Sequence, residues 1–258
     1  MTIFVRIERE TQMELNICHL YPDLLNLYGD RGNVITLSDR CARRGITVRV
    51  TDAPLGERVD LSKQDILFIG GGQDAEQGVL LDELRATRGA EIRAAILDGK
   101  VVLAICGGYQ LLGHSYKTWD GKEMDFIGAL DLHSIGGRER MTGDYMFEWD
   151  ELGEPVQIVG FENHSAKTFL GSGVKPFGKV LAGHGNNGED GTEGARYLNV
   201  FGTYSHGPLL PKNPKLADYL ISLALARKYG AAELSPLDDR FEARAHRFMV
   251  ERLSRTHS

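Results

Sequence analysis

Short apolar runs alternate with longer amphipathic stretches through the first half of the chain, which predicts strands separated by helices. The runs expected to form strands cover residues 14–20, 46–50, 65–69 and 101–105. The stretches expected to form helices cover residues 31–44 and 76–97, with Gly89 interrupting the second. Because most of the strand runs are almost entirely apolar, both faces of their sheet should be buried under helices. The pattern therefore predicts an α/β fold built on a mostly parallel sheet.

The second half of the chain is less regular, and its apolar runs are shorter. Strands are expected at residues 144–149, 156–161, 179–182 and 198–204, and helices at residues 215–229 and about 237–253. No internal repeat and no long polar linker divides the sequence. We therefore expect residues 14–258 to form one domain that includes the C-terminal helices.

Composition narrows the class of protein. Residues 1–13 are expected to be a flexible leader, because they mix acidic and basic side chains and lack the apolar centre of a secretory signal. No apolar run reaches the ~18 residues that a membrane-spanning helix needs. Cys18, Cys41 and Cys106 are scattered and lack a C-x-x-C pairing, which is typical of a reducing compartment. The net charge of -6 argues against a nucleic-acid binder. From the scattered cysteines and the lack of a signal or membrane-spanning run, we expect a cytoplasmic protein without membrane insertion.

The strongest local signal is the segment 101–110, in which an apolar strand ends at Cys106 and two glycines follow. This arrangement is typical of a nucleophile elbow, where a reactive side chain lies on a sharp turn between a strand and a helix. Free N–H groups at a helix start favour a thiolate, and the N–H of Gly107 would face the oxygen of an attacked carbonyl. The alternative is an inert buried thiol, and the flanking glycines argue against it. We interpret Cys106 as a nucleophile, and Cys18 and Cys41 as core residues.

A cysteine nucleophile needs a base, and His206 is the strongest candidate among the eight histidines. It directly follows the strand expected at residues 198–204 and precedes a proline-stiffened loop. The carboxyl ends of strands in an open α/β sheet are where such folds place their sites. His164, in a turn, is the reserve candidate, and His19 also ends a strand. We predict that Cys106 and His206 meet at one edge of the sheet.

Three glycines, Gly70 to Gly72, end another strand and allow the backbone to expose N–H groups at close range. The alternatives are an oxyanion hole shared with Gly107, a phosphate cradle and a simple tight turn. No Lys-[Ser/Thr] follows them, which excludes a phosphate-binding loop of the P-loop type. Residues 173–180 and 183–188 match nucleotide-binding motifs only weakly, because each lacks a required feature. No metal-binding cluster is recognisable.

These motifs resemble those of class I glutamine amidotransferases of the CobB/CobQ type and, among them, of the GatD subunits. The resemblance covers about residues 14–229 and rests on residues 21–33, 70–77, 106–110, 140–144, 160–164 and 202–208. Cys-Gly-Gly-Tyr-Gln at 106–110 is shared with cobyric acid synthases, whereas Leu-Asn-Leu-Tyr-Gly-Asp at 25–30 is more specific to GatD. The resemblance implies a flavodoxin-like three-layer sandwich with a mostly parallel central sheet.

Carried over by position, the resemblance implies roles for six residues. Cys106 would be the nucleophile and His206 the acid and base. Arg140 would hold the α-carboxylate of glutamine, a bidentate task that suits a guanidinium. Completing the substrate pocket would be Gln110 and the backbone amides of Gly72 and Gly107. No cofactor or metal is implied in this chain.

One position departs from the wider class. Typical class I glutaminases place a glutamate two residues after the histidine, where it orients the imidazole. Here that position is Pro208, and no acid follows before Asp218. A base without this support is weaker. The resemblance implies that a MurT-type partner supplies the acid, so glutaminase activity should be low for this chain alone and rise with the partner.

The implied activity is hydrolysis of L-glutamine to glutamate and ammonia. Because the chain lacks a recognisable ATP site, the ammonia would pass to a MurT-type ligase in a heterodimer. That partner would hold ATP and magnesium and amidate the D-glutamate of the lipid II stem peptide during peptidoglycan synthesis. Two alternatives remain open, a glutaminase of a corrinoid amide synthase and a catalytically silent scaffold of the same fold.

Overall fold

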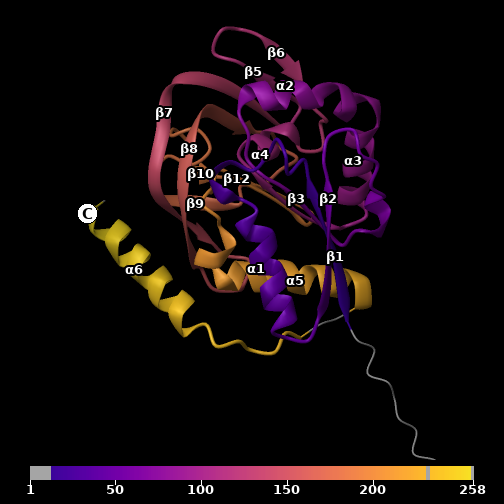
Figure 1. Ribbon diagram of the computed structural model, residues 1–258. Coiled ribbons are helices and arrows are strands. Elements are labelled where there is room, and N and C mark those ends of the chain that lie inside the picture. Colours follow the sequence, from indigo (N-terminus) through magenta and orange to yellow (C-terminus); the bar gives the residue numbers. More distant parts are fainter. Residues whose placement is uncertain (1–12, 231–232, 257–258) are drawn as a thin grey trace, which may run out of the picture.

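The computed structural model describes residues 13–230 and 233–256, and a sheet of parallel strands forms its centre (Figure 1). The strands run in the order β11-β12-β4-β3-β1-β2. Their bounds are β1 Glu14–Leu20, β2 Thr47–Ala53, β3 Ile66–Ile69, β4 Val101–Ile105, β11 Ala195–Tyr197 and β12 Val200–Thr203. Every neighbouring pair is parallel except β11 with β12, at one edge. The predicted α/β fold with a mostly parallel sheet is confirmed.

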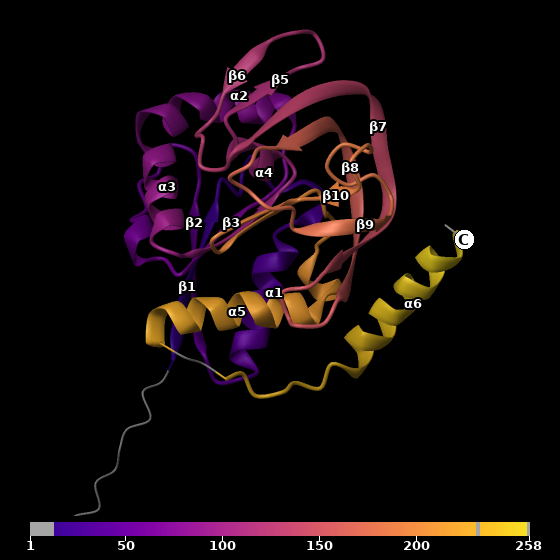
Figure 2. The same cartoon turned by 180° about the vertical axis from the view of Figure 1, so that it is seen from behind.

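Helices cover both faces of this sheet, which gives three layers (Figures 1 and 2). On one side α1 (Gly32–Ala42) packs against α5 (Pro214–Tyr229). On the other side α2 (Asp74–Glu83) and α3 (Gly89–Leu97) are joined by a π-helical turn, Leu84–Arg88. The predicted interruption at Gly89 is this turn, where a Cβ on Gly89 would lie 2.4 Å from the carbonyl oxygen of Leu84. The crossover through α1 leads from β1 outward to β2, and the crossover through α2 and α3 leads from β3 outward to β4. Because the two run in opposite directions across the sheet and such crossovers are right-handed, their helices lie on opposite faces.

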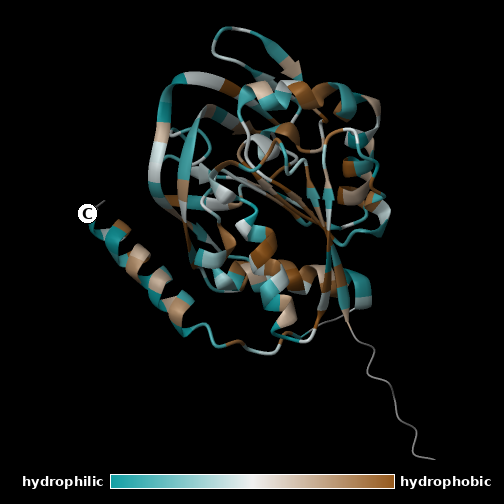
Figure 3. Ribbon diagram, in the orientation of Figure 1, coloured by the Kyte–Doolittle hydropathy of each residue, from teal (hydrophilic) through white to brown (hydrophobic). Residues whose placement is uncertain are grey.

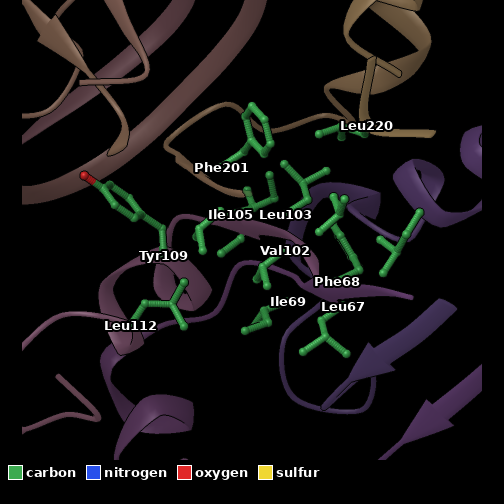
Figure 4. Close-up of a cluster of buried hydrophobic side chains, with 14 of the residues drawn as sticks. Leu67, Phe68, Ile69, Val102, Leu103, Ile105, Tyr109, Leu112, Phe201 and Leu220 are labelled. Atoms are coloured by element: carbon green, nitrogen blue, oxygen red, sulfur yellow. The ribbon is translucent and has the colours of Figure 1, made fainter. Parts of the chain in front are cut away.

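The apolar core lies on the central strands and on the inward sides of these helices (Figure 3). Leu67 and Phe68 of β3 and Val102 and Leu103 of β4 are fully buried. Figure 4 shows Leu220 of α5 among the side chains that surround this pair of strands. Burying one such side chain stabilises the fold by about 1.5–3 kcal/mol relative to leaving it exposed. The buried strands therefore fix the positions of the polar residues that follow their carboxyl ends.

A second sheet is built on two long strands, β7 (Leu132–Trp149) and β8 (Val156–Leu170), which form an antiparallel ribbon with an irregular register between Gly136 and Met141. Its shorter strands are β5 Ser115–Lys117, β6 Glu123–Asp125, β9 Gly178–Ala182 and β10 Thr192–Glu193. The sequence predicted only the parts of the ribbon at 144–149 and 156–161. The missed part of β7 mixes glycine with charged, exposed side chains, and the missed part of β8 buries mainly polar residues, so neither has the apolar pattern of a buried strand.

The C-terminal segment passes α1 and ends in α6 (Arg240–Thr256), which packs along β7 and β8 (Figure 1). Arg40 of α1 is 3% exposed and donates to Asp218 and Asp239 over N–O distances of 2.7 or 2.8 Å. Leu253 of α6 is buried against the ribbon. The hydrogen bonds of Arg40 to Asp218 and Asp239, called the clamp below, and the apolar packing of Leu253 therefore hold α6 in place.

Most predicted elements outside the ribbon are confirmed to within a few residues. The 3-10 turns Leu27–Gly29, Leu61–Lys63 and Leu210–Lys212 and the short strands β5, β6, β10 and β11 were not predicted, whereas α4 (Gly107–Leu111) is the helix expected after the elbow. The expected leader falls mainly on residues 1–12, which lie outside the described residues, and the single domain stays a prediction. Within the described ranges, no helix has the length and apolar character needed to cross a membrane.

Candidate active site

Cys106 lies on a sharp turn between β4 and α4, the geometry of a nucleophile elbow. Its φ is +47° and its ψ is -107°, a conformation that residues with a side chain rarely adopt. Such strain persists only where the surrounding structure enforces it, and it is common at functional sites. The side chain is 8% exposed and lines a pocket, so the thiol is accessible from solvent. Cys18 and Cys41 are fully buried core residues, as predicted.

Close packing explains the two glycines that follow Cys106. A Cβ on Gly107 would lie 2.6 Å from the carbonyl oxygen of Gly72. A Cβ on Gly108 would lie 2.7 Å from the carbonyl oxygen of Gly70, to which the N–H of Gly108 donates at 3.2 Å. The elbow therefore lies directly against the glycine loop that follows β3.

The N–H groups of Gly72 and Gly107 are neighbours beside the thiol. A Cβ added to Gly107 would lie 2.9 Å from the backbone nitrogen of Gly72. In the part of the chain that the structure describes, neither N–H donates to a protein acceptor. Two free amides next to a nucleophile are the arrangement that an oxyanion hole requires.

His206 follows β12 and lines the same pocket as Cys106. Because β12 pairs with β4, the two side chains come from adjacent strands at the carboxyl edge of the sheet. The backbone N–H of His206 donates to the carbonyl oxygen of Phe161 at 2.8 Å. The imidazole is buried, and the ring of Tyr28 packs against it edge-on with 4.9 Å between ring centroids. The structure thus brings together the two residues that the sequence analysis paired.

The pKa of His206 is strongly raised. Burial alone would lower the pKa of the imidazole, but the negative charge of Cys106 and the contact with Asp30 outweigh it and raise the pKa to about 10. The raised pKa favours the imidazolium form of His206 beside the thiol of Cys106.

The sequence analysis missed the acid beside His206. Oδ2 of Asp30 lies 3.1 Å from Nδ1 of His206 and accepts the N–H of Gly71 at 2.9 Å. The sequence analysis expected no acid of this chain beside His206, whereas the structure places the carboxylate of Asp30 there. That expectation concerned only acids that follow His206, whereas Asp30 precedes it by 176 residues. Asp30 lies in the segment that follows the first strand, at the same sheet edge, but no local pattern of that segment indicates the contact.

The pocket has a volume of about 540 Å³ and is lined by residues from both sheets. Arg140 and Gln110, predicted to bind substrate, both line it. Arg140 is exposed and donates from Nε to Oδ1 of Asn163 at 2.6 Å. Gln110 is buried, with its amide bonded to Gln77 at 2.6 Å and to the hydroxyl of Tyr204 at 2.9 Å. Arg140 therefore lies at the exposed rim of the pocket, hydrogen-bonded to Asn163, whereas Gln110 forms part of the buried pocket wall.

The other candidate histidines are oriented differently. His164 lines the pocket, but its ring stacks on Tyr204 with 3.6 Å between centroids and its Nδ1 lies 2.8 Å from the carbonyl oxygen of Ala166. His19 is buried in β1 away from the pocket lining, and burial lowers its pKa to about 4. The structure therefore favours His206 as the base.

The weak nucleotide-like motif at residues 183–188 wraps around a buried carboxylate. Glu162 accepts the backbone N–H groups of His184 and Gly185 at 2.9 and 3.0 Å. It also lies 2.8 Å from Nδ1 of His184. The backbone N–H groups that a phosphate would need already donate to Glu162, so the loop has a structural role.

Comparison with known proteins assigns the family. The CobB/CobQ-like glutamine amidotransferase domain matches residues 16–214, a range that contains Asp30, Cys106 and His206. The chain belongs to the CobB/CobQ-like glutamine amidotransferases. A structural relative agrees with this fold: a crystal structure of a glutamine amidotransferase from Thermotoga maritima superposes with a TM-score of 0.52 at 15% identity, covering 93% of this chain and 97% of that one. The predicted three-layer amidotransferase fold is confirmed.

Within the family, the chain falls with the GatD subunits, as the resemblance indicated. It is 43% identical over 242 residues to the GatD subunit of lipid II isoglutaminyl synthase (glutamine-hydrolyzing) of Staphylococcus aureus, covering 94% of this chain and 97% of that protein. The corresponding GatD subunit of Streptococcus pneumoniae is 42% identical over 218 residues, covering 84% and 83%. A probable cobyric acid synthase of Methanothermobacter thermautotrophicus is 36% identical over 167 residues, covering 59% of this chain but 32% of that protein.

Proposed function

We propose that this amidotransferase hydrolyses L-glutamine to glutamate and ammonia as the GatD-type subunit of a lipid II isoglutaminyl synthase. One observation carries the proposal: Cys106, on a strained elbow, shares a solvent-accessible pocket with His206 and Gly72. Among the described residues, the backbone N–H groups of Gly72 and Gly107 donate to no protein acceptor. The identity to GatD subunits over most of the chain supports the substrate.

The reaction is acyl transfer through a thioester. The thiolate of Cys106 attacks the side-chain amide carbon of glutamine, and the N–H groups of Gly72 and Gly107 hold the resulting oxyanion. When the oxyanion collapses, the C–N bond breaks and the imidazolium of His206 gives its proton to the departing ammonia. Neutral His206 then takes a proton from water, whose oxygen attacks the thioester and releases glutamate and the thiolate.

Substrate orientation is assigned to Arg140. Its guanidinium at the pocket rim suits bidentate binding of the α-carboxylate of glutamine. The Nε hydrogen bond to Asn163, at 2.6 Å, restricts the guanidinium before the substrate arrives. Gln110 shapes the pocket wall through Gln77 and Tyr204.

The ammonia is passed to a MurT-type ligase, which forms a heterodimer with this chain in the cytoplasm. That ligase holds ATP and magnesium and amidates the D-glutamate of the lipid II stem peptide, a step of cell wall synthesis. A corrinoid amide synthase partner is less well supported, because identity to cobyric acid synthases is lower and covers less of the chain. A silent scaffold is disfavoured by the complete nucleophile and base.

Replacing the nucleophile tests the proposal. Cys106→Ala in complex with the ligase should abolish glutamine-dependent amidation of lipid II, while amidation from added ammonia continues, because the synthetase reaction does not need the thiol. The measurement is isoglutaminyl product by mass spectrometry with either nitrogen source. Cys41→Ala removes a buried core thiol and should retain glutamine-dependent amidation. Glutamine-dependent product from Cys106→Ala would contradict the proposal.

A further inference from the structure

The pocket that contains Cys106 carries charges of both signs. Arg138 and Arg140 bring two guanidinium groups to it from β7. Asp74, the first residue of α2, carries the only carboxylate among the lining residues that the structure describes. A free amino acid such as glutamine is a zwitterion at neutral pH, so its pocket needs a partner for an ammonium group as well as for a carboxylate. Of the described lining residues, Asp74 is the one whose charge suits the ammonium.

A buried tyrosine fixes the carboxylate of Asp74. The hydroxyl of Tyr116 in β5 donates to it, with distances of 3.0 and 3.1 Å to the two oxygens. Tyr116 is 2% exposed, so its hydroxyl is held from the protein interior, whereas Asp74 is exposed and lines the pocket. A carboxylate has about four lone-pair sites, and one hydroxyl hydrogen leaves most of them open to a ligand. The carboxylate is thus oriented but not neutralised.

The same carboxylate lies close to the reacting end of the pocket. Asp74 follows Gly72 by two residues, which span at most about 7 Å of backbone. The backbone nitrogen of Gly72 lies beside Gly107, next to the thiol. Burial, Asp74 and the negative charge of Cys106 together raise the pKa of Tyr116, so both anionic groups lie near this hydroxyl. Glutamine carries its ammonium at the other end of a short side chain from its amide, so one molecule can reach the thiol and Asp74 at once.

Helix capping does not explain the acid at position 74. Acidic residues are common in the first turn of a helix because they interact favourably with its dipole. In α2, Glu76 accepts the backbone N–H of the N-cap residue Gln73 at 3.0 Å, as in a capping box. Within the described ranges, the hydrogen bonds of the Asp74 carboxylate come from Tyr116 and not from the helix backbone. The side chain is therefore turned to β5 and the pocket rather than to its own helix.

We propose that Asp74 binds the α-ammonium group of glutamine and that Tyr116 holds the carboxylate in place for it. The inference rests on the proposed glutaminase function and deepens it. The two charged groups of the substrate are then bound by different elements, the carboxylate by Arg140 of the ribbon and the ammonium by α2. A glutamine residue within a peptide chain lacks a free α-amino group, so this arrangement selects the free amino acid.

Asp74→Asn in the complex with the ligase tests the proposal, and glutaramate is the matched substrate, because it is glutamine without the α-amino group. Ammonia release from each compound gives kcat/KM. A hydrogen bond to a charged group corresponds to a change in binding of about 10–100-fold. We expect the wild-type complex to prefer glutamine over glutaramate by that factor. In Asp74→Asn, kcat/KM for glutamine should fall about 10–100-fold, mainly through KM, while the value for glutaramate does not fall.

Two further variants serve as controls. Asp82→Asn removes another exposed acid from α2, but Asp82 is outside the pocket lining, so both kcat/KM values should stay at the wild-type level. Tyr116→Phe keeps the carboxylate of Asp74 and removes the hydroxyl that orients it. Its preference for glutamine should fall less than that of Asp74→Asn, by about 2–10-fold.

The outcomes separate the inference from the proposed function. An equal loss for both compounds in Asp74→Asn would overturn the inference, because Asp74 would then support the pocket or the chemistry rather than the ammonium. A wild-type preference for glutamine in this variant would also overturn it. A wild-type complex that releases no ammonia counts against the proposed function, and glutamine binding measured by calorimetry then decides the role of Asp74. Weaker binding by Asp74→Asn than by wild type supports the inference, whereas equal binding or none by either protein contradicts it.

Discussion

Residue 71 can carry only a hydrogen atom as its side chain. A Cβ there would lie 2.4 Å from Cε1 of His206 and 3.1 Å from Oδ2 of Asp30. The N–H of Gly71 also donates to Asp30. Since its φ lies outside the left-handed region, the need for glycine is one of space rather than of backbone conformation. The absence of a side chain at Gly71 thus lets the imidazole of His206 and the carboxylate of Asp30 meet.

Gly71→Ala is therefore expected to displace His206 without unfolding the protein. The added methyl group pushes the imidazole away from the thiol, and a misplacement of about 1 Å costs roughly 100-fold in rate. Steady-state kinetics should show this loss in kcat, with the Tm nearly unchanged.

Gly78→Ala is the matched control. A Cβ on Gly78 meets nothing within 4 Å, so activity should stay at the wild-type level. Because alanine favours a helix interior, the free energy of unfolding should rise by about 0.5–1 kcal/mol. Wild-type turnover by Gly71→Ala would mean that the imidazole is not held against residue 71.

At the scale of elements, the ribbon is tied to the end of β12 by one buried carboxyl group. Oε1 of Glu193 in β10 accepts hydrogen bonds from the hydroxyls of Thr203 and Tyr145 at 2.6 and 3.0 Å, and from the N–H of Tyr204 at 2.9 Å. Three elements, β7, β10 and β12, converge on this oxygen just before His206. Burial raises the pKa of Glu193 to about 7 despite these donors.

This raised pKa predicts a pH dependence of stability. An unfolded glutamate titrates near 4.5, so between about 4.5 and 7 the folded chain binds the extra proton. The contribution of Glu193 to the free energy of unfolding is therefore largest below 4.5 and declines as the pH rises towards 7. Glu193→Gln removes this decline, and its Tm relative to wild type should increase by several degrees from pH 5 to pH 8.

Differential scanning calorimetry at several pH values checks the prediction. The comparison with wild type cancels groups that both proteins share. Glu123→Gln is the control, because Glu123 is 72% exposed in its pairing with Lys117 and its change should leave the pH dependence as it is. A constant Tm difference between Glu193→Gln and wild type across this range would contradict the argument.

The elements that the sequence predicted well are those with a strong apolar pattern. Strands β3 and β4 are apolar at every position, and the strand ends at Gly70 and Cys106 therefore pointed to one sheet edge. The ribbon was largely missed, because much of β7 is exposed and its strand pairing is set by β8 rather than by its own side chains. Asp30 was missed for a related reason: its contact with His206 is tertiary, and no local pattern records it.

At the scale of the whole molecule, the chain end is fastened to the helix that follows Asp30. Arg40 of α1 bridges Asp218 of α5 and Asp239 in the segment leading to α6. Arg44 adds hydrogen bonds to Asp218 at 2.8 and 2.9 Å. The guanidinium of Arg40 is 3% exposed, whereas the two carboxylates are 28% and 25% exposed. The clamp therefore joins three segments through two buried cations, Arg40 and Arg44, both 3% exposed.

Arg40→Met is expected to loosen this clamp. Removal of this guanidinium leaves Asp239 without the hydrogen bonds of Arg40, while Asp218 keeps those of Arg44. The loss of stability should be smaller than the ~3–5 kcal/mol of a fully buried pair, because the two carboxylates are 28% and 25% exposed. Hydrogen exchange should show lost protection over residues 240–256, with a lower Tm. Arg49→Met provides the comparison, because Arg49 is 72% exposed and its contact with Glu14 is 3.6 Å long. Equal protection of α6 in the two variants would contradict the role assigned to the clamp.

The position of β12 beside β4 also has a consequence for biosynthesis. Cys106 leaves the ribosome long before His206, since β12 is the last strand that the parallel sheet receives. On the proposed mechanism, a nascent chain that stops short of this strand holds the thiol without its base and should not release ammonia. Translation thus switches the enzyme on only when its final strand has been inserted, well after the first half of the sheet has been made.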